Sequence, residues 1–246
     1  KRKIKFLCSV FDTESLRELF ELNIYDIKIP SGEINNFSLL EEISKKAKKI
    51  FVSSGMANLN EINDALRILK KNKYFKKNLY LMHCHSEYPS ELKNVNMLVM
   101  PKLKKRFKIK VGYSDHTLKN SVSISAVSLG ASVIEKHFTL SKKMRGPDHK
   151  ASLEPQELKK FVNDLIETQT ILGKSKKVVS KIELLNKKKV RKSIVAKIPI
   201  TKGEKFSERN IICKRPEGGL SPKNWIKVIG KVAKRNFKKD QYINLN

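Results

Sequence analysis

The stretch KVGYSDHTLKNSVSISAVSLGASVIEKHFTL (110–140) contains the pattern that decides the fold. Two short runs with the apolar, β-branched composition of strands flank a helical segment at 119–129. A strand, a helix and a second strand in this order predict parallel strands joined by a right-handed crossover. A histidine follows each strand-like run closely, His116 after the first and His137 in the second.

The same alternation repeats six times before residue 172. Two pairs, Ser38 with Glu41 and Asn58 with Glu61, have the spacing of a capping box, and Pro155 suits the first turn of the last helix. We expect strands at 4–10, 24–29, 49–54, 79–84, 109–114 and 131–138, and helices at 13–22, 39–48, 59–72, 91–106, 119–129 and 155–172.

Six such units could form an open doubly wound sheet or most of a (β/α)₈ barrel. Polar side chains follow every strand rather than gathering at one crevice, and such a ring is typical of the carboxyl-terminal face of a barrel. We therefore predict an α/β fold, a TIM (β/α)₈-type barrel over residues 1–173 with six of its eight βα units present.

The composition changes after Gly173. The lysine-rich stretch 174–189 has little sustained apolar face and is expected to be a linker. From residue 190 to 246, short alternating runs are separated by turn signals, which predicts a small, irregular β-rich domain.

The net charge of +29 first suggests a nucleic-acid partner, but only nine of the 53 cationic residues are arginine. The lysines are spread along the chain, whereas a nucleic-acid reader concentrates arginine and aromatic residues on one face. We attribute the charge to a solvated surface and expect no nucleic-acid partner.

Cys8, Cys84 and Cys213 have no paired spacing that would indicate a disulfide framework or a zinc site. The sequence contains neither a signal-peptide pattern nor an apolar run of about 18 residues. We therefore expect no membrane partner and a cytoplasmic location.

His116 and His137 are candidate metal ligands on chemical grounds. Neighbouring parallel strands end at the same rim of a barrel, and the segment GPDHKAS (146–152) supplies a carboxylate close behind. Two imidazoles and a carboxylate could hold a divalent metal and leave positions open for a substrate. A single histidine at a strand end is more often structural, so the prediction depends on the pair.

Six motifs, in this order along the chain, resemble those of the sialic acid synthase family, and the C-terminal residues resemble the antifreeze-like (SAF) domain that follows the barrel in those enzymes. The barrel motifs are KIPSGE (28–33), SSGMA (53–57), LMHCHSEYPS (81–90), VGYSDHT (111–117), IEKHFTL (134–140) and GPDHKASLEP (146–155). The C-terminal motifs are PITKGE (199–204), KRPEGG (214–219) and VIGKVAKRNFKKDQYI (228–243).

The resemblance implies a metal-dependent, cytoplasmic transferase of carbohydrate biosynthesis. Such an enzyme condenses phosphoenolpyruvate with N-acetylmannosamine or a related 2-acetamido hexose and water, giving a nine-carbon 2-keto acid of the N-acetylneuraminate type and phosphate. Legionaminic or pseudaminic acid synthases and N-acylneuraminate-9-phosphate synthases are alternatives within the class. The implied cofactor is Mn²⁺, with Mg²⁺ or Co²⁺ as alternatives, and the implied assembly is a domain-swapped homodimer.

The resemblance also assigns residues. His116 and His137 correspond to the metal ligands, and Glu33 to a catalytic carboxylate that also contacts the sugar. The positions that correspond to phosphoenolpyruvate contacts are Ser9, Lys28, Ser31, Ser53, Ser86 and Ser114. The positions that correspond to sugar contacts are Glu33, Tyr88, Asp148 and Arg215.

Each assignment has a structural alternative. Lys28 could be a strand-end lysine with its ammonium group in water, Glu33 a helix cap or first-turn acid, and Tyr88 a packing residue. Asp148 could be a turn residue after a proline, and Arg215 a surface residue.

Two departures from the family pattern affect these expectations. Nothing here corresponds to the two strands with which the family begins, so we expect a fragment of a longer enzyme that is inactive by itself; robust synthase activity of this chain would contradict that. Ser86 stands where some members have asparagine, which leaves the sugar's substituents open. A basic polyanion-binding protein and an inactive synthase remnant are the competing functions.

Overall fold

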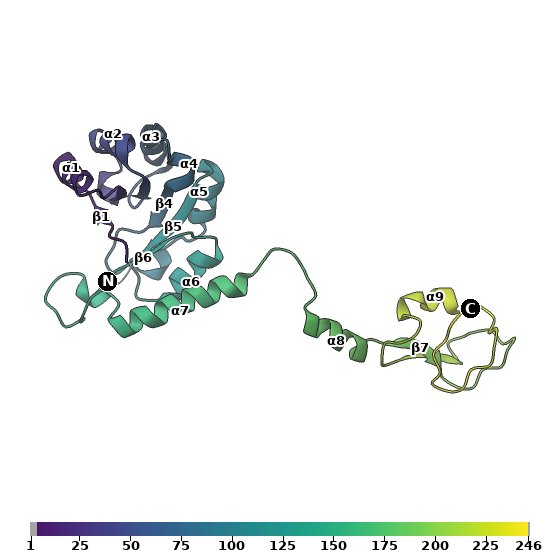
Figure 1. Ribbon diagram of the computed structural model, residues 1–246. Coiled ribbons are helices and arrows are strands. Elements are labelled where there is room, and N and C mark those ends of the chain that lie inside the picture. Colours follow the sequence, from purple (N-terminus) through teal and green to yellow (C-terminus); the bar gives the residue numbers. More distant parts are fainter. Residues whose placement is uncertain (1–3, 246) are drawn as a thin grey trace. The chain divides into compact units, whose positions relative to one another are not determined.

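The computed structural model describes residues 4–245. The chain forms two compact units, which divide between Gly173 and Lys174 and are described separately here (Figure 1). Within residues 4–245, no helix combines the length and the apolar character that a membrane span requires.

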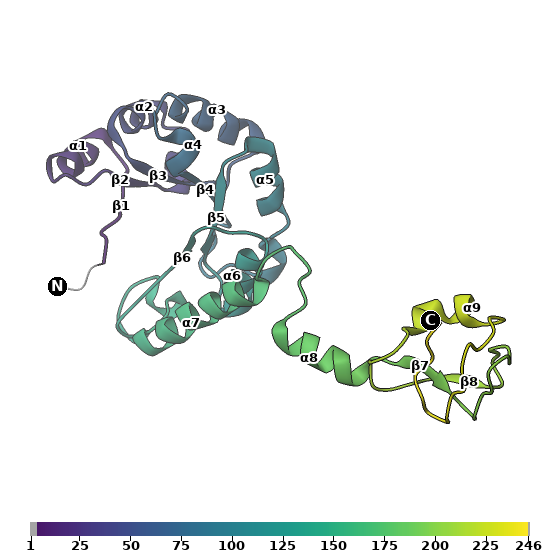
Figure 2. The same cartoon turned by 45° about the vertical axis from the view of Figure 1, so that its right-hand side comes forward.

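The N-terminal unit is built on one six-stranded parallel sheet in which the strands lie side by side in sequence order. The sheet is curled into a half barrel, which confirms the predicted α/β class (Figure 2). The strands are β1 (Cys8–Ser9), β2 (Asp26–Ile29), β3 (Lys49–Ser53), β4 (Leu79–Cys84), β5 (Lys110–Asp115) and β6 (Ile134–Lys136).

The helices between the strands cover the convex side of this sheet (Figure 2). They leave the concave side free of helices, as in a barrel whose inner face holds side chains only. The helices of this unit are α1 (Thr13–Glu21), α2 (Phe37–Lys46), α3 (Leu59–Leu69), α4 (Phe75–Asn78), α5 (Val99–Phe107), α6 (Asn120–Ser128) and α7 (Pro155–Leu172).

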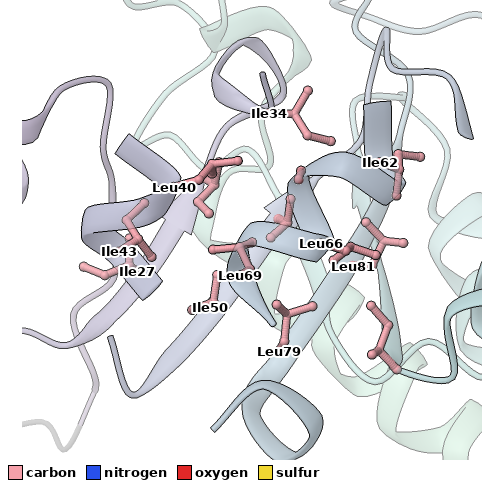
Figure 3. Packing of buried hydrophobic residues seen from close by; sticks show 14 of the residues in the cluster. Ile27, Ile34, Leu40, Ile43, Ile50, Ile62, Leu66, Leu69, Leu79 and Leu81 are labelled. Carbon is pink, nitrogen blue, oxygen red and sulfur yellow. The ribbon is translucent and has the colours of Figure 1, made fainter. Parts of the chain in front are cut away.

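The strand register divides the side chains between the two faces. Ile27, Ile50 and Leu79 are aligned across β2, β3 and β4 and are buried in the core beneath the helices (Figure 3). The next residues, beginning with Lys28 and Phe51, point to the opposite, concave face because strand side chains alternate. Polar side chains on the concave face therefore follow from the register.

Two of the predicted helix starts can be compared with the observed caps. Asn58 and Glu61 form the expected capping box of α3. The box expected from Ser38 is wrong, because Asn36 caps α2 by accepting a hydrogen bond from the backbone nitrogen of Leu39 (3.3 Å). Helix α7 begins at Pro155 and ends before Gly173, as the sequence predicts.

The two edge strands are shorter than predicted. Strand β1 covers only Cys8–Ser9 of the expected 4–10, and Ile4 is 86% exposed. Strand β6 covers only Ile134–Lys136 of the expected 131–138. Each of these strands has one neighbouring strand in the described sheet. On its other side it lacks the ladder of hydrogen bonds that a central strand makes with a second neighbour.

The helix predicted at 91–106 is also shorter than expected. It begins as a 3₁₀ turn at Leu92–Asn94 and becomes α-helical only at Val99. Asn96 lies between these segments with a φ of 44°, which is incompatible with a continuous right-handed helix.

The C-terminal unit is small and irregular. Strands β7 (Ser193–Ala196) and β8 (Ile211–Lys214) form its antiparallel sheet, and a short helix, α9 (Trp225–Val228), follows them in the sequence. Single β-bridges such as Ile200 with Phe237 complete a β-rich fold around its own core. The predicted small β-rich C-terminal domain is therefore confirmed.

The stretch expected to be a linker contains a helix, α8 (Lys181–Val190). Ser180 and Glu183 form a capping box at its start. Its apolar residues Ile182, Leu184 and Leu185 are exposed in the described chain. Local capping and helix-forming lysine and leucine residues account for this helix better than core packing does.

Candidate functional site

The two predicted histidines lie together at the carboxyl ends of β5 and β6. His116 is 8% exposed, and the side chain of His137 is 30% exposed. Their ring centroids are 5.4 Å apart and the rings meet edge to face. The structure therefore brings the pair close enough to face one small ligand.

Hydrogen bonds fix the orientation of the His116 ring. Its Nδ1 donates to the carbonyl oxygen of His85 (2.7 Å), and its Nε2 lies 3.3 Å from the hydroxyl of Ser114. Burial lowers the pKa of His116, and the nearby His137 lowers it further, although the bond to His85 acts in the opposite direction. A neutral ring protonated on Nδ1 keeps the lone pair of Nε2 free for a metal or a proton donor.

Two predicted sugar-contacting residues lie beside the histidines. The ring centroid of Tyr88 is 4.2 Å from the ring centroid of His116 and 5.5 Å from that of His137. A carboxylate oxygen of Asp148 is 3.8 Å from Nδ1 of His137. Tyr88 is 52% exposed, so its edge is free to meet a ligand above the imidazoles.

Lys28 reaches across the curled sheet. Its ammonium group is 3.1 Å from the carboxylate of Glu135, although their strands, β2 and β6, are separated by three others. The side chain of Lys28 is 8% exposed, so it is a buried cation on the concave face rather than a surface lysine. Ser9 is paired in register with Lys28 and therefore shares that face.

A cluster of small polar side chains lies at the ends of β2, β3 and β4. Ser31 Oγ accepts a hydrogen bond from the backbone nitrogen of Gly55 (3.1 Å) and lies 3.3 Å from Cys84 Sγ. A Cβ atom built on Gly55 would be 2.2 Å from Ser86 Oγ, so Ser86 belongs to the same cluster. Ser53 is buried at the end of β3.

The structure does not bring every predicted residue to the histidines. The carboxylate of Glu33 accepts a hydrogen bond from Asn36 Nδ2 (2.8 Å), and within residues 4–245 no hydrogen bond or ion pair joins it to either histidine. Arg215 belongs to the C-terminal unit and is exposed there.

Four residues at this rim are not predicted from the sequence as candidates for function: Gly55, Glu135, and the buried pair Asp115–Lys136. The carboxylate of Asp115 is 3.1 Å from the ammonium of Lys136, and these side chains are 0% and 4% exposed. Period-two alternation in the run 131–138 would have placed Glu135 with His137 on one face and Lys136 on the other.

The residues fit a divalent metal with a small protein ligand set. Within residues 4–245, no group of three or more His, Cys, Asp or Glu residues is arranged to hold a metal. Two imidazoles side by side, one oriented by a carbonyl oxygen on its other nitrogen, could still provide two ligands and leave positions open for substrate oxygens.

A cavity of about 650 Å³ lies at the amino-terminal end of the sheet, between α1 and α2. Its lining includes Arg17, Tyr25 and Lys46 but none of the predicted site residues. The predicted residues of the N-terminal unit instead lie on the open concave face and at the carboxyl-terminal rim. That rim combines two adjacent imidazoles, a buried cation and several hydroxyl groups, and such a set could hold a cation and an anion side by side.

Comparison with known proteins shows the family that the sequence motifs indicate. A profile described as the NeuB family matches residues 1–177, and a SAF domain profile matches residues 191–246. The N,N′-diacetyllegionaminic acid synthase of Campylobacter jejuni is 51% identical over 99% of this chain and 73% of its own length. Human N-acetylneuraminate-9-phosphate synthase is 34% identical over 98% of this chain and 67% of its own length.

A solved structure agrees with the sequence relatives. The N-acetylneuraminic acid synthetase of Leptospira borgpetersenii, in complex with citrate, superimposes with a TM-score of 0.67 at 34% identity. The match covers 72% of this chain and 61% of that one. With a family profile over more than half of its residues, the chain belongs to the NeuB family and carries a SAF domain at its C-terminal end.

Proposed function

We propose that this chain carries the condensing site of a cytoplasmic sialic acid-type synthase. In the proposed reaction, carbon 3 of phosphoenolpyruvate attacks the aldehyde carbon of an open-chain 2-acetamido hexose, a carbon–carbon bond forms and the aldehyde oxygen takes up a proton. Water then adds at carbon 2 and phosphate leaves, which gives a nine-carbon 2-keto acid. The observation that carries the proposal is the edge-to-face pair of His116 and His137 on the rim that also holds Lys28.

The proposed metal site consists of the Nε2 lone pair of His116 and a ring nitrogen of His137. A divalent ion there, Mn²⁺ with Mg²⁺ or Co²⁺ as alternatives, would act as a Lewis acid on the aldehyde oxygen. The bond from His116 Nδ1 to His85 supports this role, because it fixes the ring and its tautomer.

Lys28 is proposed to bind the negative charge of phosphoenolpyruvate. Its ammonium is buried and faces the concave side, where a charge-assisted hydrogen bond is stronger than in water. Hydroxyl groups are proposed to complete the anion site from neighbouring strand ends, namely Ser9, Ser31, Ser53, Ser86 and Ser114.

Tyr88 and Asp148 are proposed sugar contacts, since both lie beside the histidines that would face the aldehyde. Glu33 is proposed to orient or deprotonate the attacking water, and Arg215 of a second copy to reach the sugar in a domain-swapped homodimer. Within the class, the 51% identity to an N,N′-diacetyllegionaminic acid synthase, against 35% to the pseudaminic acid synthase of the same organism and 34% to the human 9-phosphate synthase, supports the legionaminic acid alternative.

The test is phosphate release that requires both substrates. We would incubate the protein with phosphoenolpyruvate, Mn²⁺ and a panel of acetamido hexoses, and determine product masses. Because a complete (β/α)₈ barrel has eight βα units, the assay also includes a form extended at its start by two such units. Failure of that form to release phosphate with any sugar would contradict the proposal.

Alanine variants of His116 and His137 test whether turnover depends on the two proposed metal ligands. His116→Ala and His137→Ala should each abolish turnover while the circular dichroism spectrum stays the same. His83→Gln is the matched control, because His83 bonds the carbonyl oxygen of Val95 (2.9 Å) and is not among the proposed site residues. Unchanged rates in both alanine variants would overturn the ligand assignment.

A further inference from the structure

Both imidazoles lie just past the end of the ladder that joins β5 to β6. The last paired residues are Asp115 and Lys136, which directly precede His116 and His137. Beyond this pair, the backbone of each histidine bonds elsewhere: the His116 carbonyl accepts from Ser90 (2.9 Å) and the His137 carbonyl from Leu153 (2.9 Å). The spacing of the two rings therefore depends on what ties the strands at their last pair.

The side chains of Asp115 and Lys136 provide that tie. Their charged groups are 3.1 Å apart, and the Lys136 ammonium also donates to the carbonyl oxygen of Thr117, the residue after His116. The ammonium group of Lys136 therefore bonds to the residue before His116 and to the residue after it.

The carboxylate of Asp115 is held from several directions. One oxygen accepts from the backbone nitrogen (2.9 Å) and the hydroxyl (2.8 Å) of Thr117, and the other accepts from Ser123 Oγ in α6 (2.6 Å). Its place is therefore fixed by β5, β6 and α6 together.

Strand alternation places this pair on the face opposite the histidines. Ser114 and Glu135 are aligned across β5 and β6 on the concave side, so Asp115 and Lys136 point to the convex side. Neither residue can touch a substrate on the concave face.

We propose that the Asp115–Lys136 pair is a positioning device that sets the distance between His116 and His137. The inference rests on the metal site of the proposed function. A buried ion pair that also bonds to both strand segments holds a strand junction in one geometry, and partners that orient metal ligands without touching the metal commonly change its affinity by 10- to 100-fold.

The test is Mn²⁺ affinity, measured by the electron paramagnetic resonance signal of the free ion in a titration of the metal alone. Lys136→Met should weaken Mn²⁺ binding by about 10-fold or more. Because a lone buried carboxylate could unfold the unit, the double variant Asp115→Asn/Lys136→Met, which leaves no charge at this strand junction, is measured beside it and should show the same loss.

Two controls separate positioning from general stability. Ser123→Ala removes one bond to Asp115 but leaves the cross-strand pair, so it should lower the urea midpoint while Mn²⁺ affinity stays at the wild-type value. Lys71→Met makes the same change in net charge at an exposed pair with Glu41 (3.0 Å) and should also leave the affinity unchanged.

The outcomes distinguish this inference from the proposed function. If the wild-type protein binds Mn²⁺, His137→Ala abolishes binding and the double variant keeps wild-type affinity, the positioning role is overturned while the metal site stands. If Mn²⁺ affinity merely follows the urea midpoint across all variants, the role is structural and the inference is also overturned. Absence of Mn²⁺ binding by the wild-type protein would contradict both.

Discussion

Position 55 requires glycine because neighbouring side chains leave no room for a Cβ atom, and not because the backbone needs a special conformation. An added Cβ would be 2.2 Å from Ser86 Oγ, 2.8 Å from Ser31 Oγ and 3.2 Å from Cys84 Sγ. Ser31 follows β2, whereas Cys84 and Ser86 lie at the end of β4, so the absence of a side chain just after β3 lets three strand ends close around a small polar cluster.

Gly55→Ala should therefore disrupt the cluster. We expect a loss of about 1–3 kcal/mol in the free energy of unfolding, because the neighbours must move apart, together with weaker phosphoenolpyruvate binding. Urea denaturation and isothermal titration calorimetry measure the two effects. Gly32→Ala is the matched control, since a Cβ there meets no atom within 4 Å.

A second prediction concerns Tyr113, which is fully buried in β5. Among residues 4–245, its hydroxyl has no hydrogen-bond partner, and burial raises its pKa far above the ordinary value. Tyr113→Phe removes an unsatisfied polar group and should leave the stability unchanged or raise it by about 1 kcal/mol in urea denaturation. A clear loss of stability would mean that the hydroxyl is satisfied in solution.

At the scale of elements, the loop after β8 is organised by a single side chain from β7. The hydroxyl of Ser193 accepts hydrogen bonds from the backbone nitrogens of Gly218 and Gly219 (3.0 Å each) and donates to the carbonyl oxygen of Pro216 (3.1 Å). Because the loop carries Arg215, its shape decides where that guanidinium points.

Ser193→Ala should destabilise the C-terminal unit by about 1–3 kcal/mol, since three partly buried hydrogen bonds lose their partner. Trp225 is the only tryptophan of the chain and lies in this unit, so its fluorescence during urea unfolding measures the effect directly. Ser207→Ala is a suitable comparison, because the bond of that residue to Asn210 uses its backbone nitrogen. Equal midpoints for the two variants would contradict the role of Ser193.

The elements also show what the sequence can reveal. Helix α7 was predicted to the residue because Pro155 and Gly173 mark both ends, and β4 because neighbours on both sides extend it. The edge strands are predicted too long, because composition does not show that each of them pairs with only one neighbouring strand in the described sheet. Likewise, the histidine pair could be predicted from strand ends, whereas Gly55 and Asp115–Lys136 depend on register across strands.

At the scale of the whole molecule, the chain is two folded units joined by an exposed segment. Residues 174–180 are exposed and contain no helix or strand, and Lys174, Lys176 and Lys177 lie in this stretch. The described α/β unit has its own core, as does the β-rich unit.

Brief trypsin treatment should therefore cleave first between Gly173 and α8. We expect two resistant fragments in intact-mass spectra, because helix and sheet hydrogen bonds protect the lysines inside each unit. The lysine cluster of α5, with Lys104 and Lys105, is an internal control for protection by structure. Early cleavage there would contradict the division into two stable units.

The bridge between Lys28 and Glu135 has a consequence for the choice of ligand. In the free protein, the buried ammonium already has an internal counter-ion from the far strand. An incoming anion must displace the carboxylate of Glu135 from Lys28, so a monovalent anion such as chloride gains little binding free energy by replacing it. An acid with several charges can outcompete the carboxylate, so the proposed anion site would favour such an acid over the abundant monovalent salts.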